Sequence, residues 1–328
     1  MRRREFIAGI GAVASWPRAA KAQQSAMPVI GFLGATSPEG YATFVRGFLL
    51  GLKDEGFVDT ENVAIAYHWA QGQYDRLPAL AADFVSRGVS AIVATGGLQT
   101  SLAAKQATQT IPIVFTLGSD PIKFGLVSSL NRPGGNITGV TLFAYLLDAK
   151  RVELMHELVP GAAAIALLVN PNTPAQVSEA QFAEVEAASR KFGQQLVLLK
   201  AGTESEIDQA VATMAQSKAG ALLVSADPFF LSNRDRLIAL VTRHAIPSIF
   251  EWRQFVEAGG LMSYGIDLVD AYRQAGTYVG RILRGARPAD LPILQPTKFE
   301  FVINLKAARA LGIVVPNTML VAASEVIE

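Results

Sequence analysis

The sequence predicts an α/β protein of two Rossmann-like lobes with mainly parallel sheets, joined by a multi-strand hinge. Short apolar runs rich in β-branched residues alternate with longer segments in which apolar residues recur at helical spacing. This alternation starts afresh near residue 148, and the chain then continues well past a second complete series. The length of 328 residues suits two domains of roughly 150 residues each.

The first series occupies residues 27–142 and forms the predicted N-terminal lobe. Its strands are expected at Val29–Leu33, Val63–Tyr67, Ala91–Ala94, Ile113–Phe115 and Ile137–Thr141. Between them, apolar stripes at Phe44–Leu52 and Leu77–Val85 predict two helices, and a third ends at Ala107. Strands separated by helix-length segments predict crossover units and therefore a parallel sheet.

The second series occupies residues 143–265 and forms the predicted C-terminal lobe. Its strands are expected at Ala164–Val169, Leu196–Leu199, Ala221–Val224, Ser248–Phe250 and Leu261–Tyr264. The helices are expected near Asp148–Val159, Ala175–Phe192, Glu204–Gln216 and Asn233–His244. The same alternation predicts a second parallel sheet.

The last part of the chain predicts the hinge. A helix at Leu268–Leu283, a strand at Phe299–Ile303 and a helix at Leu305–Leu311 follow the second series. We assign residues 266–296 to the N-terminal lobe and residues 297–328 to the C-terminal lobe. The chain then crosses between lobes near Thr141–Phe143, Tyr264–Asp267 and Gln295–Lys298, and such parallel crossings permit hinge closure around a ligand.

Residues 1–22 have the pattern of a cleaved signal peptide. Arg2–Arg4 form a basic start, Phe6–Ser15 is a short apolar segment, and Ala20–Ala22 fits a cleavage site. The arginine pair also suits the twin-arginine route, with Sec export as the alternative. We therefore expect a periplasmic protein, and because the sequence has no cysteine it is not a lipoprotein.

Composition and motifs exclude several classes of function. Outside residues 1–22 the chain carries 24 basic and 27 acidic residues, a net charge of −3, and shows no basic cluster for nucleic acid. The three histidines, His68, His156 and His244, lack the spacing of a metal site. Since no nucleophile elbow, phosphate loop or dinucleotide fingerprint is present, we expect neither catalysis nor a cofactor.

Six segments of the chain match a known family in their residues: Tyr74–Leu80, Ile92–Gly97, Asn131–Val140, Val224–Phe230, Ala258–Gly265 and Gln295–Glu300. On these segments the chain resembles the ABC-transporter substrate-binding proteins, a family that includes tryptophan- and tyrosine-binding members. The resemblance covers essentially the whole chain after residue 22. It implies the type I periplasmic binding-protein fold, a small-molecule ligand, a permease partner in the inner membrane and a monomeric state.

The first lobe offers candidate ligand contacts in the loops after its strands, where open parallel sheets bind ligands. These are Thr36, Ser37, Tyr41, Gly96, Gly97, Thr116 and Ser119. Gly96 and Gly97 precede a helix, where free amides attract a carboxylate; a simple tight turn is the alternative. Thr36 or Ser37 either caps the next helix or offers its hydroxyl to the cleft, and Tyr41 either covers the ligand or lies in the core.

The second lobe offers Asn170, Asp227, Phe229, Glu251, Tyr264 and Asp267. Glu251 ends a strand where an acid has no capping role, and the resemblance implies an acid near this place for a ligand ammonium. Its alternative role is an ion pair with Arg253 or another base. The others have structural alternatives: a turn at Asn170, a helix cap at Asp227, core packing at Phe229, and hinge structure at Tyr264 and Asp267.

This set of residues suits an amino acid, with an aromatic or branched side chain preferred. Amide dipoles match its carboxylate, an acid matches its ammonium, and aromatic walls at Tyr41, Trp69, Phe229 or Phe250 match its side chain. On this hypothesis, Glu251→Gln weakens the binding of an amino ligand. A ligand-sensing subunit for a membrane receptor is the alternative function, and a periplasmic enzyme on the same scaffold is less favoured.

Overall fold

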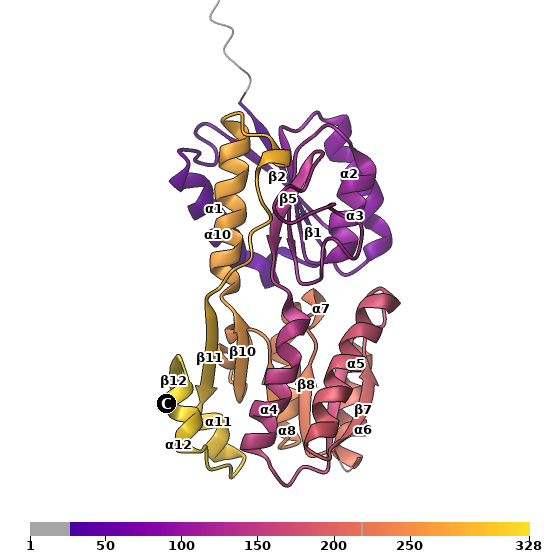
Figure 1. Ribbon diagram of the computed structural model, residues 1–328, viewed down its shortest axis with the longest axis vertical. Helices are drawn as coiled ribbons and strands as arrows, with labels where there is room; N and C mark the ends of the chain where they lie inside the picture. The colour runs from indigo at the N-terminus through magenta and orange to yellow at the C-terminus, as the bar shows by residue number, and fades with distance from the viewer. Residues whose placement is uncertain (1–26, 218) are drawn as a thin grey trace, which may run out of the picture.

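The protein folds into two α/β lobes arranged along its long axis (Figure 1). The computed structural model describes residues 27–217 and 219–328, so the predicted signal peptide at residues 1–22 lies outside the described residues. Each lobe has a mainly parallel sheet with helices packed on its faces. The predicted fold class is confirmed.

The first sheet has five parallel strands within the described residues, in the order β2–β1–β3–β4–β5. The strands are β1 (Val29–Gly34), β2 (Ala64–Trp69), β3 (Ala91–Thr95), β4 (Ile113–Leu117) and β5 (Ile137–Thr141). The helices between them are α1 (Pro38–Asp54), α2 (Leu77–Ser86) and α3 (Leu98–Ala107), with a 3₁₀ turn at Tyr74–Arg76. Strands β3, β4 and β5 are buried along their whole length, as expected of a sheet covered on both faces.

The second sheet has seven strands within the described residues, in the order β12–β11–β10–β9–β8–β6–β7. The strands are β6 (Ala164–Val169), β7 (Gln195–Lys200), β8 (Ala221–Val224), β9 (Ser248–Phe250), β10 (Met262–Ile266), β11 (Phe299–Asn304) and β12 (Glu325–Ile327). The helices are α4 (Asp148–Leu158), α5 (Ala175–Lys191), α6 (Glu204–Gln216), α7 (Pro228–Ser232), α8 (Arg234–Arg243), α9 (Arg253–Glu257), α11 (Leu305–Ala310) and α12 (Asn317–Ala322). Only β10 and β11 pair antiparallel among the described strands, because the chain returns from the other lobe between them.

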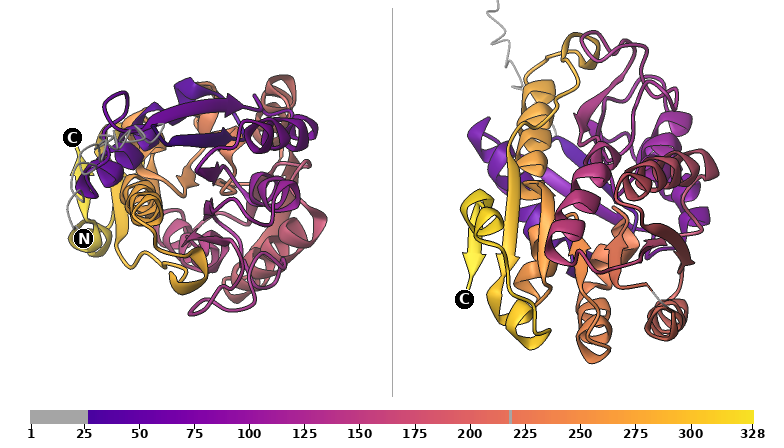
Figure 2. Two further views of the ribbon diagram at one scale, coloured as in Figure 1. Left: turned by 90° about the horizontal axis from the view of Figure 1, so that it is seen from above. Right: turned by 60° about the horizontal axis from the view of Figure 1, so that its bottom comes forward.

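Helix α10 (Leu268–Leu283) packs against α1 of the first lobe, although it directly follows a strand of the second sheet (Figures 1 and 2). Glycines make this contact close: a Cβ atom on Gly51 would overlap the Arg273 carbonyl oxygen, and one on Gly276 would overlap the Phe48 carbonyl oxygen. An ion pair of 2.8 Å between Arg273 and Asp54 lies at the edge of the same contact. Residues distant in sequence therefore complete the first lobe.

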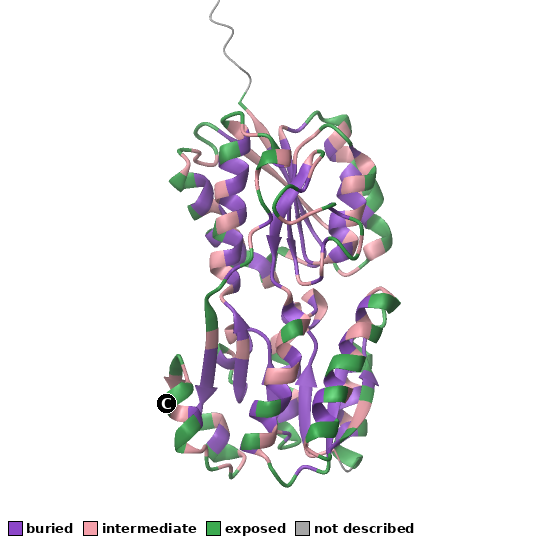
Figure 3. Cartoon of the chain, viewed as in Figure 1, coloured by how far each residue is buried: buried purple, intermediate pink, exposed green. Residues whose placement is uncertain are grey.

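The described chain passes between the two sheets three times. The first passage runs from β5 through the 3₁₀ helix η2 (Ala144–Leu147) into α4. The second passage runs from β10 directly into α10. The third runs into β11 from a segment near Leu294, a residue that forms a β-bridge with Val140 of β5. The purple strands in Figure 3 are buried in both lobes, and these passages connect the two cores.

Candidate ligand-binding site

A cavity of about 60 Å³ lies between the facing ends of the two lobes. The lining includes six of the residues predicted from the sequence: Tyr41, Gly96, Gly97, Thr116, Ser119 and Asp227. Among the first-lobe residues, Thr116 lies near the end of β4 and the others follow β1, β3 and β4, while Asp227 follows β8. The carboxyl ends of parallel strands thus meet at this cavity from both sides.

The two lobes touch each other across the mouth of this cavity. The Ser232 hydroxyl donates a hydrogen bond of 2.9 Å to Thr36 Oγ1, which joins α7 to the loop after β1. The Gln99 amide donates a hydrogen bond of 2.9 Å to the Asn172 carbonyl oxygen, which joins α3 to the loop after β6. These contacts hold the lobes together in a closed arrangement.

Asp227 places a buried carboxylate on the cavity wall. It accepts hydrogen bonds from Asn170 Nδ2 at 3.0 Å, Thr173 Oγ1 at 2.9 Å and the Phe229 backbone amide at 2.8 Å. Burial raises the pKa of Asp227, and these three donors lower it in part. Among the described residues no basic side chain lies within ion-pair distance of this carboxylate. A ligand ammonium would supply the missing positive charge.

The turn before α3 supplies backbone amides to the opposite wall. Gly96 has a φ of +88° and Gly97 a φ of +110°, conformations that L side chains rarely adopt. A Cβ atom on Gly96 would also lie 2.7 Å from the Ala35 Cβ atom. Since α3 begins at Leu98, its first amides have no partner within the helix and favour an anion. This wall suits a carboxylate.

Aromatic side chains form much of the remaining lining: Tyr41, Tyr74, Tyr145, Trp252 and Tyr272. Burial raises the pKa of Tyr272 to about 12, so its hydroxyl stays protonated and can donate a hydrogen bond. The Trp252 indole nitrogen is buried and has no hydrogen-bond partner within the described part of the chain. An unpaired buried donor costs about 1–3 kcal/mol, and a ligand acceptor would remove that cost.

Glu251 does not line the cavity, which corrects the prediction that it binds a ligand ammonium. Its carboxylate lies 3.5 Å from Arg151 Nη2 in the interior of the second lobe. Arg151 is fully buried and also pairs with Asp148, so two carboxylates share one guanidinium. Glu251 therefore has the alternative role named above, an ion pair with a base, but that base is Arg151 rather than Arg253.

The environment of Glu251 predicts a pH-dependent stability. Burial, and to a smaller extent the Asp148 charge, raise the pKa of Glu251 to about 8 despite Arg151. The pKa of Glu251 is higher in the folded protein than in the unfolded chain. The stabilisation that comes from protonated Glu251 is therefore complete below about pH 4.5 and is lost as pH rises through about 8. We expect the free energy of unfolding to fall by roughly 2–4 kcal/mol between pH 5 and pH 9.

Urea denaturation across this range, on wild type and Glu251→Gln, measures the effect. The variant keeps a neutral side chain of similar shape, so its stability should vary much less with pH. Buried Asp148 and Asp227 also have raised pKa values and leave a residual slope of the same sign in the variant. Parallel curves for the two proteins would contradict the assignment to Glu251.

The structure gives structural roles to several other predicted ligand residues. Thr36 bonds to Ser232 across the lobes, and Ser37 precedes α1 without the expected side-chain cap. Asn170 positions Asp227 and does not line the cavity. The half-buried Phe229 ring packs beside Phe230 on the hydrophobic core instead of facing the cavity.

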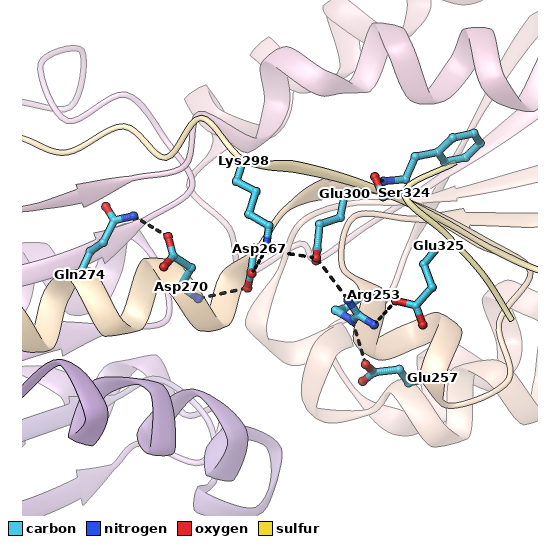
Figure 4. A network of polar contacts seen from close by, with 10 residues as sticks. Arg253, Glu257, Asp267, Asp270, Gln274, Lys298, Glu300, Ser324 and Glu325 are labelled. Atoms are coloured by element: carbon cyan, nitrogen blue, oxygen red, sulfur yellow. Dashed lines mark hydrogen bonds and ion pairs between the residues drawn. The ribbon is translucent and has the colours of Figure 1, made fainter. Parts of the chain in front are cut away.

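Tyr264 and Asp267 belong to the hinge rather than to the cavity. The Tyr264 ring stacks on Phe299 of the returning strand β11. Asp267 accepts the Asp270 backbone amide at the start of α10 and pairs with Lys298 at 3.0 Å (Figure 4). This contact joins the second and third passages between the lobes. Both residues therefore have the hinge role that was given above as their alternative.

Sequence reasoning missed more of the cavity lining than it found. The missed residues are Tyr74, Leu98, Gln99, Gly118, Leu142, Tyr145, Thr173, Pro174, Val177, Ala226, Pro228, Leu231, Trp252, Leu268 and Tyr272. Four of the missed residues adjoin predicted ones and follow strands: Gly118, Ala226, Pro228 and Trp252. The rule that ligand contacts lie in the loops after parallel strands therefore also covered these four. Val177 and Tyr272 project from long helices, where no local pattern separates a cavity residue from a core residue.

Two further properties of the described residues concern membranes and metals. No described helix has the length and apolar character to cross a membrane. Nor does the described part of the chain bring together three or more histidine, cysteine or acidic side chains as a metal site would require.

Fold and cavity together define a two-lobed α/β protein with a cavity between two mainly parallel sheets. Comparison with known proteins then identifies the family: the chain belongs to the ABC transporter substrate binding proteins, whose family model matches residues 29–327. A tyrosine-binding protein of Clostridioides difficile (strain R20291) is 30% identical over 266 residues, covering 81% of this chain and 75% of that protein.

Solved structures share the fold at comparable identity. A domain from Streptococcus pneumonia in complex with L-Trp is 28% identical, with a TM-score of 0.81 over 92% of this chain and 99% of that one. The ligand-free, open structure of a substrate binding protein with adhesive properties from Clostridium difficile is 26% identical with the same coverage, but its TM-score is 0.65. The present structure is thus more similar overall to the L-Trp complex than to the open form.

Proposed function

We propose that this protein is the periplasmic receptor of an ABC importer and that it binds an α-amino acid with an aromatic or branched side chain between its lobes. The single observation that carries the proposal is Asp227, a buried carboxylate on the cavity wall with no basic partner among the described residues. A charge in this position is costly unless a ligand pairs with it.

The rest of the cavity supports the same ligand. The amides at the start of α3 and the hydroxyls of Thr116 and Ser119 suit the carboxylate of an amino acid. The unpaired Trp252 indole and the surrounding tyrosines provide aromatic surface with donors at its edge. Relatives that bind tyrosine or L-Trp add support for an aromatic side chain.

In this proposal the protein works as a monomer that is exported through the signal peptide at residues 1–22. It closes on its ligand, delivers it unchanged to a permease in the inner membrane, and reopens. The hydrogen bonds of Thr36 and Gln99 across the lobes support such closure, because they form only when the lobes meet.

Thermal denaturation of ligand-free protein, prepared by unfolding and refolding, tests the proposal. We expect L-tyrosine or L-tryptophan to raise the Tm, since ligand at 100 times its Kd adds about 2.7 kcal/mol to stability. Tyramine lacks the carboxylate and 3-(4-hydroxyphenyl)propanoate lacks the ammonium, so neither should raise the Tm measurably. A set of twenty amino acids that leaves the Tm unchanged would overturn the proposal.

A further inference from the structure

A second hollow of about 490 Å³, which we call the outer chamber, adjoins the cavity between the lobes and is open to solvent beside the exposed residues Lys123, Leu146, Ala183 and Glu184. The two spaces share Gly118, Tyr145 and Val177 in their linings. Because Gly118 has no side chain, the Tyr145 and Val177 side chains form the boundary between them. The outer chamber therefore adjoins the proposed binding site, with these two side chains between them.

The outer chamber takes its walls from both lobes and from the first passage between them. Its apolar surface comes from Phe124 of the first lobe, Phe143 and Leu146 of the passage, and Ala180 and Ala183 of α5. The alanines leave the α5 side of the chamber unfilled. Three charged residues, Asp120, Lys123 and Glu184, also line the chamber. This is a largely apolar space with polar groups, the usual character of a small-molecule site.

The volumes of the two spaces decide how a ligand would occupy them. A cavity of roughly 150 Å³ is known to hold a benzene molecule. The inner cavity, at about 60 Å³, falls well below that, whereas the outer chamber, at about 490 Å³, is several times larger. In the closed arrangement the charged groups of an amino acid fit beside Asp227 and α3, but an aromatic side chain needs the outer space.

We infer that the outer chamber is the side-chain subsite, and that the protein accepts α-amino acids whose apolar side chains extend beyond a single ring. The ammonium and carboxylate remain in the inner cavity, and the side chain passes Tyr145 and Val177. This inference rests on the proposed function, because Asp227 and α3 must hold the head of the ligand.

Calorimetric titration with L-tyrosine and O-benzyl-L-tyrosine tests the inference. The added benzyl group should enter the outer chamber and lower the Kd about tenfold, since burying its apolar surface is favourable. Ala180→Phe fills part of the chamber and should weaken O-benzyl-L-tyrosine at least about tenfold, with L-tyrosine changed by less than about threefold. Glu179→Phe, at an exposed position on another face of the same helix, is the control and should change neither Kd.

The outcomes separate the inference from the function on which it rests. Tight binding of L-tyrosine with rejection of O-benzyl-L-tyrosine overturns the outer subsite and leaves the proposed function standing. Equal affinities of Ala180→Phe and wild type for the benzyl ether also overturn it. Failure of both amino acids to bind wild-type protein overturns the proposed function and the inference together.

Discussion

Asp227→Asn should weaken the binding of L-tyrosine or L-tryptophan by about 100-fold or more, which corresponds to about 2.7 kcal/mol. The substitution keeps the size of the side chain and removes the charge that we propose to face the ligand ammonium. Truncating one partner of a buried charge pair typically costs about 2–5 kcal/mol of binding energy. Isothermal titration at neutral pH measures the change in Kd.

The Asp227→Asn variant should still fold, because the buried Asp227 carboxylate destabilises the ligand-free wild-type protein through its desolvation cost. Burial raises the Asp227 pKa, so neutral asparagine avoids a desolvation cost that aspartate bears. Asparagine keeps one oxygen to accept the Phe229 amide at the start of α7, but its NH2 group cannot accept from the Thr173 hydroxyl, and this loss offsets part of the gain. We expect the stability of the ligand-free variant to differ from wild type by less than about 1 kcal/mol.

Glu251→Gln is the matched control for binding, since it replaces a buried carboxyl group of the same lobe, outside the cavity, with an amide of similar shape. We expect its Kd to stay within about threefold of wild type. If Glu251→Gln lost affinity and Asp227→Asn did not, the hypothesis drawn from the sequence would be right and the placement of the ligand ammonium at Asp227 would be wrong.

Arg151→Met should lower the free energy of unfolding by about 3–5 kcal/mol at pH 8. Arg151 is fully buried and pairs with Asp148 and Glu251. It also donates to the Tyr264 carbonyl oxygen at 2.8 Å and the Ala144 carbonyl oxygen at 3.3 Å, which belong to β10 and to the first passage. Methionine leaves two buried carboxylates without a cation and two carbonyl groups without this donor.

Urea denaturation at several pH values tests the origin of this loss. The loss should shrink toward pH 5, because protonated Asp148 and Glu251 no longer need a cation. The triple variant with Asp148→Asn and Glu251→Gln should recover much of the stability, since no buried charge then remains in the cluster. Arg190→Met removes an exposed ion pair with Glu186 on α5 and should cost less than about 1 kcal/mol. A loss for Arg151→Met as small as that of this control would contradict the account.

Much of the fold was predictable because hydrophobic periodicity is a local property of the chain. The helix at Glu204–Gln216 and the strand at Ile137–Thr141 begin and end where the pattern predicts. The short helices α9 and α12 and the strand β12 were missed, since three to six residues carry no measurable period. Strand β12 depends on pairing with β11, a contact that its own residues do not encode.

The site was only partly predictable, for a different physical reason. Loops after parallel strands are local features, and Gly96, Thr116 and Asp227 were found through them. Glu251 also ends a strand, but its surroundings are set by Arg151 on α4, a hundred residues earlier in the chain. Tertiary packing decides whether an acid contacts a ligand or an internal base. The position of the acid along a strand does not determine that packing.

The contact of α10 with α1 has a consequence for how the protein is made. Arg273 bonds to Asp54 across 219 positions in the sequence. The first lobe therefore lacks α10 until most of the polypeptide has left the ribosome (Figure 1). Until then the glycine-lined face of α1, with Phe44 and Phe48, has no covering helix. A gene fragment that stops after the fifth strand would therefore yield a first lobe without its covering helix, and we expect that product to aggregate.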